Sequence, residues 1–289
     1  MKAPVAAQRV QLHVQSLGSG DPVLFLHGFG ASSFTWRAWV PELARRHRVL
    51  LLDMKGFGSS PKPRDGCYTP SDLAGGVHDF IRERDLRRLA IVGHSLGGGV
   101  ALLVALRLLD DGEDRLERLV AVGGVAYRQT IPFYVDVLRR LPRAGFLFGL
   151  LPAPWLIRRV LESIFHDPSQ VTTEQVEGYS RPLTTPDARD ALVTCARQLL
   201  PRDLDEIVAR FPEIDVPALL LWGRQDRVVP LSVAERLARE LPRARLAVLE
   251  GCGHVPPEEK PEESLRIVAA FLAEARRESG TSPHAGTGG

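Results

Sequence analysis

The chain lacks the long apolar runs and clustered cysteines that mark membrane-spanning and disulfide-stapled proteins. None of its apolar runs approaches the roughly 20 residues needed to cross a bilayer. The short apolar stretch near the N-terminus is broken by Pro4, Gln8 and Arg9, which makes it too weak for a secretion signal. The three cysteines form no C-x-x-C pair and no metal-ligand spacing: Cys67, Cys195 and Cys252. We therefore expect a soluble cytoplasmic protein with free thiols, no metal and no stable membrane insertion.

Strong charge of one sign is also missing. The chain has 37 lysines and arginines against 35 aspartates and glutamates, so its formal net charge is only +2. No strong electrostatic field therefore favours nucleic acid or an anionic membrane as the partner. The glycine-rich motifs of nucleotide-binding folds, G-x-G-x-x-G after a first strand and G-x-x-x-x-G-K-[ST], are absent as well. We expect no nucleic-acid partner and no cofactor, and a small molecule as the ligand.

What the chain does contain is a regular alternation of strand and helix patterns. Short runs that are apolar on both faces cover 23–26, 49–52, 89–92 and 119–122, and further runs cover 218–222 and 245–249. Residues 9–15 alternate between apolar and polar, which is typical of a half-buried antiparallel edge strand. We also expect Ser33 to cap a helix that continues through Leu43. The sequence predicts an α/β fold with a doubly wound, mostly parallel sheet.

The interval 127–211 has no comparable strand, is punctuated by proline, and is helical over 135–141 and 155–165. We interpret it as a helical cap inserted between two parts of a core domain, 1–126 and 212–278, with a disordered polar tail over 279–289. Large apolar side chains of the cap are candidates for an acyl pocket: Phe133, Phe146, Phe148 and Trp155. The alternative, that these side chains only pack the cap against the core, stays open.

The residues around Ser95 carry the chemistry. An apolar strand ends at Gly93-His94-Ser95-Leu96-Gly97, and a run of helix formers follows, which is the G-x-S-x-G nucleophile elbow in its expected context. Gly93 and Gly97 allow the tight turn, and Gly98 and Gly99 ease contact between helix and sheet. Ser95 should therefore stand exposed at the strand tip, beside the N-terminus of the helix that follows. The alternative is a glycine-rich turn of a nucleotide-binding fold, whose motifs are absent.

A serine hydroxyl needs a base, and the base needs an acid to hold it. His254 follows the last strand in a glycine-rich loop, whereas the other histidines lie in turns, helices, the edge strand, the cap or the tail. Asp226 follows the preceding strand, so the order serine, acid, histidine is the one expected for this elbow. Asp53 also ends a strand, but it opens a glycine loop that we interpret as a structural turn.

Two backbone N–H groups are needed to stabilise an oxyanion, and we assign them to Leu96, directly after the serine, and to Phe29, in the loop after strand 23–26. Gly28 lets that loop fold close to the serine. Residues flanking the predicted site complete the expected substrate pocket: His27, Gly28, His94 and Val255.

With these residues assigned, the chain resembles the α/β-hydrolase superfamily from about Val10 to Ala275. The turns that carry the resemblance are HGFG (27–30), DMKGFGS (53–59), GHSLGG (93–98), GRQDRVVP (223–230) and GCGHV (251–255). The resemblance implies Ser95 as nucleophile, His254 as base and Asp226 as acid, with Phe29 and Leu96 as oxyanion donors. Family members that are dehalogenases or epoxide hydrolases carry aspartate at the nucleophile position, so serine argues against both.

The function expected first is that of a cap-bearing serine esterase, which cleaves apolar carboxylic esters through an acyl-enzyme intermediate. The alternative within the superfamily is carbon–carbon bond hydrolysis of a ring-cleavage product by the same triad. Enzymes of that kind often have asparagine and methionine flanking the serine, whereas this chain has His94 and Leu96. A ligand receptor built on a hydrolase scaffold is a third possibility.

Overall fold

The computed structural model describes residues 9–141, 150 and 152–274. Within these residues, seven strands form one sheet in the order β1-β3-β2-β4-β5-β6-β7. The strands are β1 (Val14–Leu17), β2 (Pro22–Leu26), β3 (Arg48–Leu52), β4 (Leu89–His94), β5 (Leu116–Val122), β6 (Ala218–Gly223) and β7 (Ala244–Leu249). All pairs are parallel except β1 with β3. The predicted antiparallel edge strand is thus confirmed, although it begins later in the chain than the alternation indicates.

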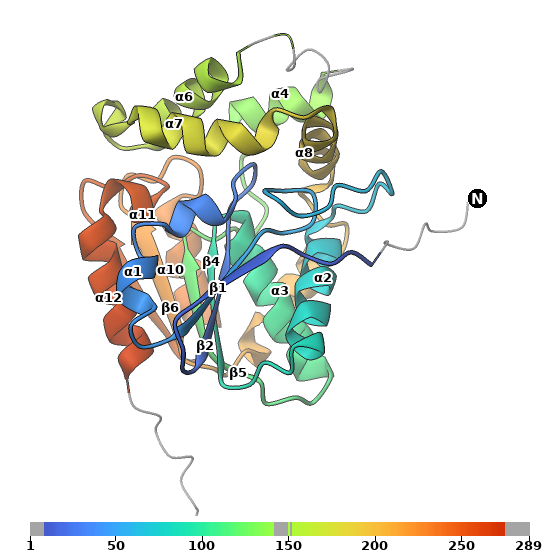
Figure 1. Cartoon of the computed structure of the whole chain (residues 1–289). Helices are drawn as coiled ribbons and strands as arrows, with labels where there is room; N and C mark the ends of the chain where they lie inside the picture. Colours follow the sequence, from blue (N-terminus) through green and yellow to red (C-terminus); the bar gives the residue numbers. More distant parts are fainter. Residues whose placement is uncertain (1–8, 142–149, 151, 275–289) are drawn as a thin grey trace, which may run out of the picture.

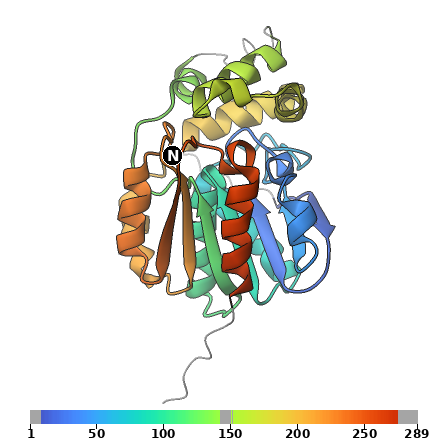
Figure 2. The same cartoon turned by 90° about the vertical axis from the view of Figure 1, so that its left-hand side faces the viewer.

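Helices cover both faces of the sheet, because the central strands are apolar on both sides. Leu24 and Leu26 of β2 pack on the face covered by α2 (Pro70–Glu83), α3 (Leu96–Asp110) and α10 (Leu231–Glu240). Val23 and Phe25 of β2 pack on the other face, under α1 (Val40–Leu43) and α12 (Pro261–Ala273). Figure 2 shows α12 lying in front of the sheet. The predicted doubly wound, mostly parallel sheet is confirmed.

The predicted continuous helix from Ser33 through Leu43 is wrong. The structure instead has a short 3₁₀ turn, η1 (Ser33–Trp36), followed by the separate helix α1. Ser32, not Ser33, caps the turn, since its hydroxyl accepts the N–H of Phe34. Pro41 explains the break: its ring would clash with the carbonyl of Arg37 one turn earlier in a continuous helix.

The helices between β5 and β6 lie over one edge of the sheet. They are α4 (Phe133–Arg140), α6 (Ala153–Ile164), α7 (Thr173–Ser180), α8 (Pro186–Gln198) and α9 (Leu204–Ala209), and the described part of this interval contains no strand. Figure 1 shows α4, α6, α7 and α8 above the edge where the parallel strands have their carboxyl ends. The helices expected over 135–141 and 155–165 are confirmed as α4 and α6. Phe146, Phe148 and the tail 279–289 lie outside the described residues.

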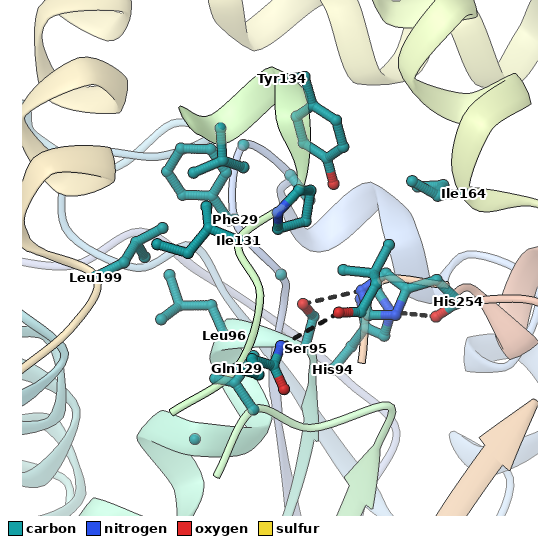
Figure 3. Close-up of a pocket in the computed structure, with 18 of the residues that line it drawn as sticks. Phe29, His94, Ser95, Leu96, Gln129, Ile131, Tyr134, Ile164, Leu199 and His254 are labelled. Carbon is teal, nitrogen blue, oxygen red and sulfur yellow. Dashed lines mark hydrogen bonds between the residues drawn. The ribbon is translucent and has the colours of Figure 1, made fainter. Parts of the chain in front are cut away.

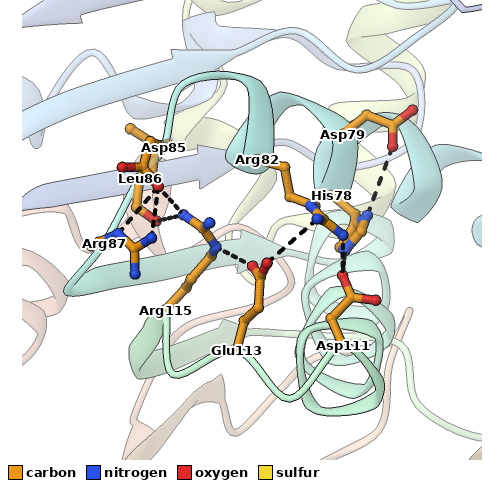
Figure 4. Close-up of polar contacts among 9 residues, drawn as sticks. All are labelled: His78, Asp79, Arg82, Asp85, Leu86, Arg87, Asp111, Glu113 and Arg115. Atoms are coloured by element: carbon orange, nitrogen blue, oxygen red, sulfur yellow. Dashed lines mark hydrogen bonds and ion pairs between the residues drawn. The ribbon is translucent and has the colours of Figure 1, made fainter.

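At the end of the sheet away from Ser95, charged side chains form a network (Figure 4). The Arg115 guanidinium, whose side chain is 8% exposed, donates to Asp85 at 2.7 Å, to the carbonyl of Leu86 at 3.2 Å, and to Glu113. Asp111 accepts hydrogen bonds from both His78 and Arg82 of α2, each at 2.8 Å. These contacts tie α2 to the segments that enter β4 and β5, at the end of the sheet away from Ser95.

Candidate active site

Ser95 occupies a strained turn between β4 and α3. Its backbone φ is +53°, a value that residues other than glycine rarely adopt. The turn is so tight that a Cβ on Gly93 would lie 2.2 Å from the carbonyl oxygen of Gly97. A Cβ on Gly97 would lie 2.3 Å from the carbonyl oxygen of Leu26 on β2. Glycine is therefore required at both positions, and Ser95 is held at the tip of the strand.

The structure brings the three predicted triad side chains into one hydrogen-bonded line. His254 Nε2 lies 3.0 Å from Ser95 Oγ, and His254 Nδ1 lies 2.8 Å from Asp226 Oδ2. Ser95 follows β4, Asp226 follows β6 and His254 follows β7, so the carboxyl ends of three parallel strands supply one side chain each. The Asp226 side chain is fully buried, and that of His254 is 4% exposed. The carboxylate can hold Nδ1 protonated, which leaves Nε2 free to accept the serine proton.

Asp226 is itself fixed by backbone groups. Its Oδ1 accepts the N–H of Val228 at 2.8 Å and of Val229 at 2.9 Å, so that only Oδ2 faces the imidazole. Gly123, at the end of β5, leaves room for the pair: a Cβ there would lie 3.3 Å from both Asp226 Oδ2 and His254 Nδ1. The carboxylate therefore has a single orientation toward His254.

The two predicted oxyanion donors lie on the cavity side of Ser95. Leu96 is the first residue of α3, so its N–H has no partner within the helix. Phe29 lies in the loop after β2, and in the part of the chain that the structure describes neither N–H has a hydrogen-bond partner. Gly28 permits the loop to approach, since a Cβ there would lie 3.3 Å from Ser95 Cβ and 3.0 Å from His94 Nδ1. These free N–H groups can stabilise negative charge beside Ser95.

The two histidines beside the site, His27 and His94, are both buried but differ in role. His94 Nε2 donates to the carbonyl of His254 at 2.9 Å, while its Nδ1 has no partner among the described residues. Burial, and then the nearby His254, lower the pKa of His94 to about 3, so His94 is neutral. His27 donates from Nδ1 to the Gly28 carbonyl and accepts the N–H of Met54 at Nε2. Burial lowers the pKa of His27 as well.

A cavity of about 410 Å³ opens above Ser95 (Figure 3). It lies between the sheet edge and the helices of 127–211, with α4 and α6 both contributing to its wall. Of the predicted pocket residues that the structure describes, four line it: Gly28, His94, Phe133 and Val255. The described lining contains no lysine, arginine, aspartate or glutamate side chain. The cavity is thus a mostly apolar space with Ser95 and His254 in its wall.

Two predicted pocket residues do not line this cavity. Both nitrogens of His27 are engaged by backbone groups of the loops beneath it, which turns the ring away from the cavity. Trp155 lies at the start of α6 with 52% of its surface exposed, and the guanidinium of Arg159 lies 5.8 Å from its ring centroid. The sequence pattern predicts that His27 and Trp155 lie near the site, but it does not determine the direction in which a side chain points.

Sequence reasoning also missed residues that shape the site. Figure 3 shows Tyr134 of α4 above Ser95, with its hydroxyl pointing into the cavity. Burial raises the pKa of Tyr134, so it stays a hydrogen-bond donor. Glu259, five residues after His254, is buried and binds backbone N–H groups on both sides of that histidine. A buried glutamate in a run of exposed-type charges (PPEEKPEE) gives no signal by itself.

The described residues contain no group of three or more histidine, cysteine, aspartate or glutamate side chains placed to hold a metal ion. In the same part of the chain, none of the helices combines the length and the apolar character needed to cross a bilayer.

Comparison with known proteins places this arrangement in a family. The model of the alpha/beta hydrolase family matches residues 23–267, and the chain belongs to that family. A 2-hydroxy-6-oxo-2,4-heptadienoate hydrolase of Pseudomonas putida is 29% identical over 275 residues, which cover 93% of this chain and 95% of that protein. Hydrolase activity is therefore supported by the family.

Solved structures give the same result. A meta-cleavage product hydrolase (CumD) of Pseudomonas fluorescens IP01 is similar with a TM-score of 0.77 and 26% identity, covering 92% of this chain and 96% of that chain. A thermophilic esterase of Thermogutta terrifontis is similar with a TM-score of 0.74 and 25% identity, covering 91% of this chain and 93% of that chain. The proteins similar to this chain therefore include both a meta-cleavage product hydrolase and an esterase.

Proposed function

We propose that the protein hydrolyses carboxylic esters, with Ser95 as nucleophile, His254 as general base and Asp226 as its orienting acid. Ser95 Oγ attacks the ester carbonyl carbon while its proton passes to His254 Nε2 at the 3.0 Å contact. The carbonyl oxygen takes the negative charge and accepts the N–H groups of Phe29 and Leu96. Collapse breaks the bond to the alkoxy group, which takes the proton from His254 and leaves an acyl group on Ser95.

Water then completes the cycle. It adds to the acyl carbon and gives its proton to His254, and the bond between the acyl carbon and Ser95 Oγ breaks as the serine recovers that proton. The Nδ1 contact with Asp226 at 2.8 Å stabilises the imidazolium formed in both steps. No redox group is required, because each step moves only protons and electron pairs between the ester, water and these side chains.

The observation that supports a neutral, apolar ester is the uncharged lining of the cavity. The described lining is mostly aliphatic and aromatic, with polar atoms contributed by tyrosine, threonine, glutamine, serine and histidine side chains. An apolar acyl or alkoxy chain would bury its surface there, which stabilises binding by about 25 cal/mol per Å². A charged substrate group would lose its hydration without meeting an opposite charge, at a cost of several kcal/mol.

Carbon–carbon bond hydrolysis is the second candidate, and the relatives named above support it. A dienoate, the substrate in the name of the Pseudomonas putida relative, carries a carboxylate. No arginine or lysine is found among the described residues lining this cavity to pair with such a group. This difference is our reason for placing ester hydrolysis first.

We also propose that residues 127–211 act as a cap whose helices determine substrate choice. Phe133, Tyr134 and Val137 of α4 and Ile157 and Ile164 of α6 all line the cavity above Ser95. The bottom of the cavity, by contrast, is formed by the sheet edge with its triad. Acyl-chain preference should therefore change with substitutions in α4 and α6.

A substrate panel tests the proposal. The wild-type protein is assayed with p-nitrophenyl esters of increasing acyl length and with 2-hydroxy-6-oxo-2,4-heptadienoate, and Ser95→Ala is assayed in parallel. We expect kcat/KM for at least one neutral ester to exceed that for the dienoate, and Ser95→Ala to lose at least about 10³-fold. A dienoate cleaved faster than every ester would favour the second candidate instead.

A further inference from the structure

Glu259 is a buried carboxylate that serves the loop carrying His254. It lies in the short helix α11 (Pro256–Glu259), and it is 6% exposed. Its Oε1 accepts the N–H of Val255 at 2.9 Å, and its Oε2 accepts the N–H groups of Gly253 at 2.8 Å and His166 at 2.7 Å. The described residues give it no ion-pair partner, and its hydrogen bonds come from three backbone N–H groups, which stabilise its charge.

These contacts surround His254 on both sides. Gly253 and Val255 are its two chain neighbours, and both donate to the one carboxylate. The N–H of His254 itself donates to the carbonyl of Ile164 at 3.0 Å, and its carbonyl accepts from His94. The loop between β7 and α11 has no regular secondary structure, so these polar contacts fix the height and the direction of the imidazole.

The same carboxylate ties the loop to the helices above the cavity. His166 and Ile164 lie at the C-terminal end of α6, and a Cβ on Gly253 would lie 2.5 Å from the carbonyl oxygen of Ile164. The loop is thus packed backbone against backbone on the end of α6. A displacement of that end would be passed directly to His254.

We propose that Glu259 is a positioning residue for the serine–histidine pair, acting on His254 through the N–H groups of Gly253 and Val255. The inference rests on the proposed function, since it assigns His254 as the base. A base must be held within hydrogen-bond reach of the hydroxyl, and a displacement of about 1 Å can cost 10²-fold in rate. Glu259 holds the Nε2 to Oγ distance at 3.0 Å without touching the substrate.

The neighbouring Glu258 provides a matched control. Its side chain is 3% exposed, and it accepts hydrogen bonds from Arg37 at 2.9 Å, Tyr179 at 2.8 Å and Gln175 at 3.0 Å. Arg37 lies at the C-terminal end of η1, and Tyr179 and Gln175 lie in α7. None of these partners lies in the loop that carries His254. The Glu258 side chain is therefore also largely buried and hydrogen-bonded, but it holds a different part of the molecule.

The experiment compares Glu259→Gln, Glu259→Asp and Glu258→Gln with the wild type in the full chain. In Glu259→Gln, the amide oxygen can keep the two donors of Oε2, so the NH₂ group is set against the N–H of Val255. In Glu259→Asp, the charge is kept, but the carboxylate is withdrawn by about one C–C bond length, roughly 1.5 Å. Thermal unfolding, kcat and KM for a neutral p-nitrophenyl ester, and the rate of Ser95 labelling by a fluorophosphonate are measured for each.

We expect both glutamine variants to melt at a lower temperature than the wild type. Below the transition, Glu259→Gln should lose about 100-fold in kcat and in labelling rate with KM within about threefold, and Glu259→Asp about tenfold. Glu258→Gln should keep kcat within about threefold. Equal losses in Glu258→Gln and Glu259→Gln, or a Glu259→Asp with wild-type kcat, would overturn the positioning role.

The wild type separates this inference from the function on which it rests. A wild type that is not labelled at Ser95 contradicts the proposed function. A wild type that is labelled and active, beside Glu259 variants of equal kcat, contradicts only the inference about Glu259.

Discussion

Replacing Asp226 with asparagine tests the electronic role of the carboxylate with little change of shape. Asp226 Oδ1 accepts two backbone N–H groups, from Val228 and Val229, at 2.8 and 2.9 Å. An asparagine must keep its carbonyl oxygen there, because the flipped amide would set its NH₂ against both N–H donors. The NH₂ group is then fixed opposite His254 Nδ1, where the carboxylate oxygen stood at 2.8 Å.

That geometry fixes the wrong tautomer of the imidazole. The amide donates to Nδ1, so the ring proton moves to Nε2, and the nitrogen facing Ser95 at 3.0 Å becomes a donor instead of an acceptor. The serine then has no base. We expect kcat for a p-nitrophenyl ester to fall about 10⁴-fold, equivalent to about 5.5 kcal/mol in the activation free energy.

Asp53→Asn is the matched control. Asp53 also follows a strand, is 2% exposed, and accepts the N–H groups of Ser33 at 2.7 Å and Ser59 at 2.8 Å. It makes no contact with His254, so its replacement should lower the melting temperature but leave kcat within about tenfold. A loss below about tenfold in Asp226→Asn, or equal losses in the two variants, would refute the reasoning.

Three further predictions concern Gly123, His94 and Arg115. Gly123→Ala places a methyl group 3.3 Å from both Asp226 Oδ2 and His254 Nδ1, at a residue whose φ is +53°. It should therefore lower the free energy of unfolding, measured by urea titration, by about 1–2 kcal/mol and lower kcat at least tenfold. Burial lowers the pKa of His94 from 6.5 to about 3. Between about pH 3 and pH 6.5, His94 is therefore protonated in the unfolded chain but neutral in the folded protein. The free energy of unfolding should fall as the pH drops below about 6.5, by up to about 1.4 kcal/mol per pH unit from His94. It should fall less steeply in His94→Asn. Equal slopes in the variant and the wild type would contradict the lowered pKa of His94. Arg115→Ala, at the far edge of the sheet, should cost about 1–3 kcal/mol in urea while kcat stays unchanged.

The sequence predicts most of the fold and the triad because their signals are local. Gly93 to Gly99 combines a strand end, a tight turn and a helix start within a few residues, and each of these has its own residue preference. His254 and Asp226 follow from their position directly after strands, since the carboxyl ends of parallel strands meet at one edge. The structure brings these side chains together at that edge.

Other features depend on contacts that no local pattern contains. His27 directly follows β2 and His94 ends the neighbouring strand β4. Only His94 lines the cavity, because backbone groups of the loops below bind both nitrogens of His27. The three donors of Glu259 include His166, 93 residues away in the chain. The sequence does contain a signal for the helix break before α1, because Pro41 lies inside the segment predicted to be one continuous helix.

Labelling with a fluorophosphonate, followed by mass mapping, tests the central claim most directly, because it asks whether Ser95 is the activated hydroxyl. We predict one adduct per chain, on the peptide that contains Ser95, with labelling and ester turnover lost together in Ser95→Ala and in Asp226→Asn. An adduct on another residue, or ester turnover that survives in Ser95→Ala, would contradict the account.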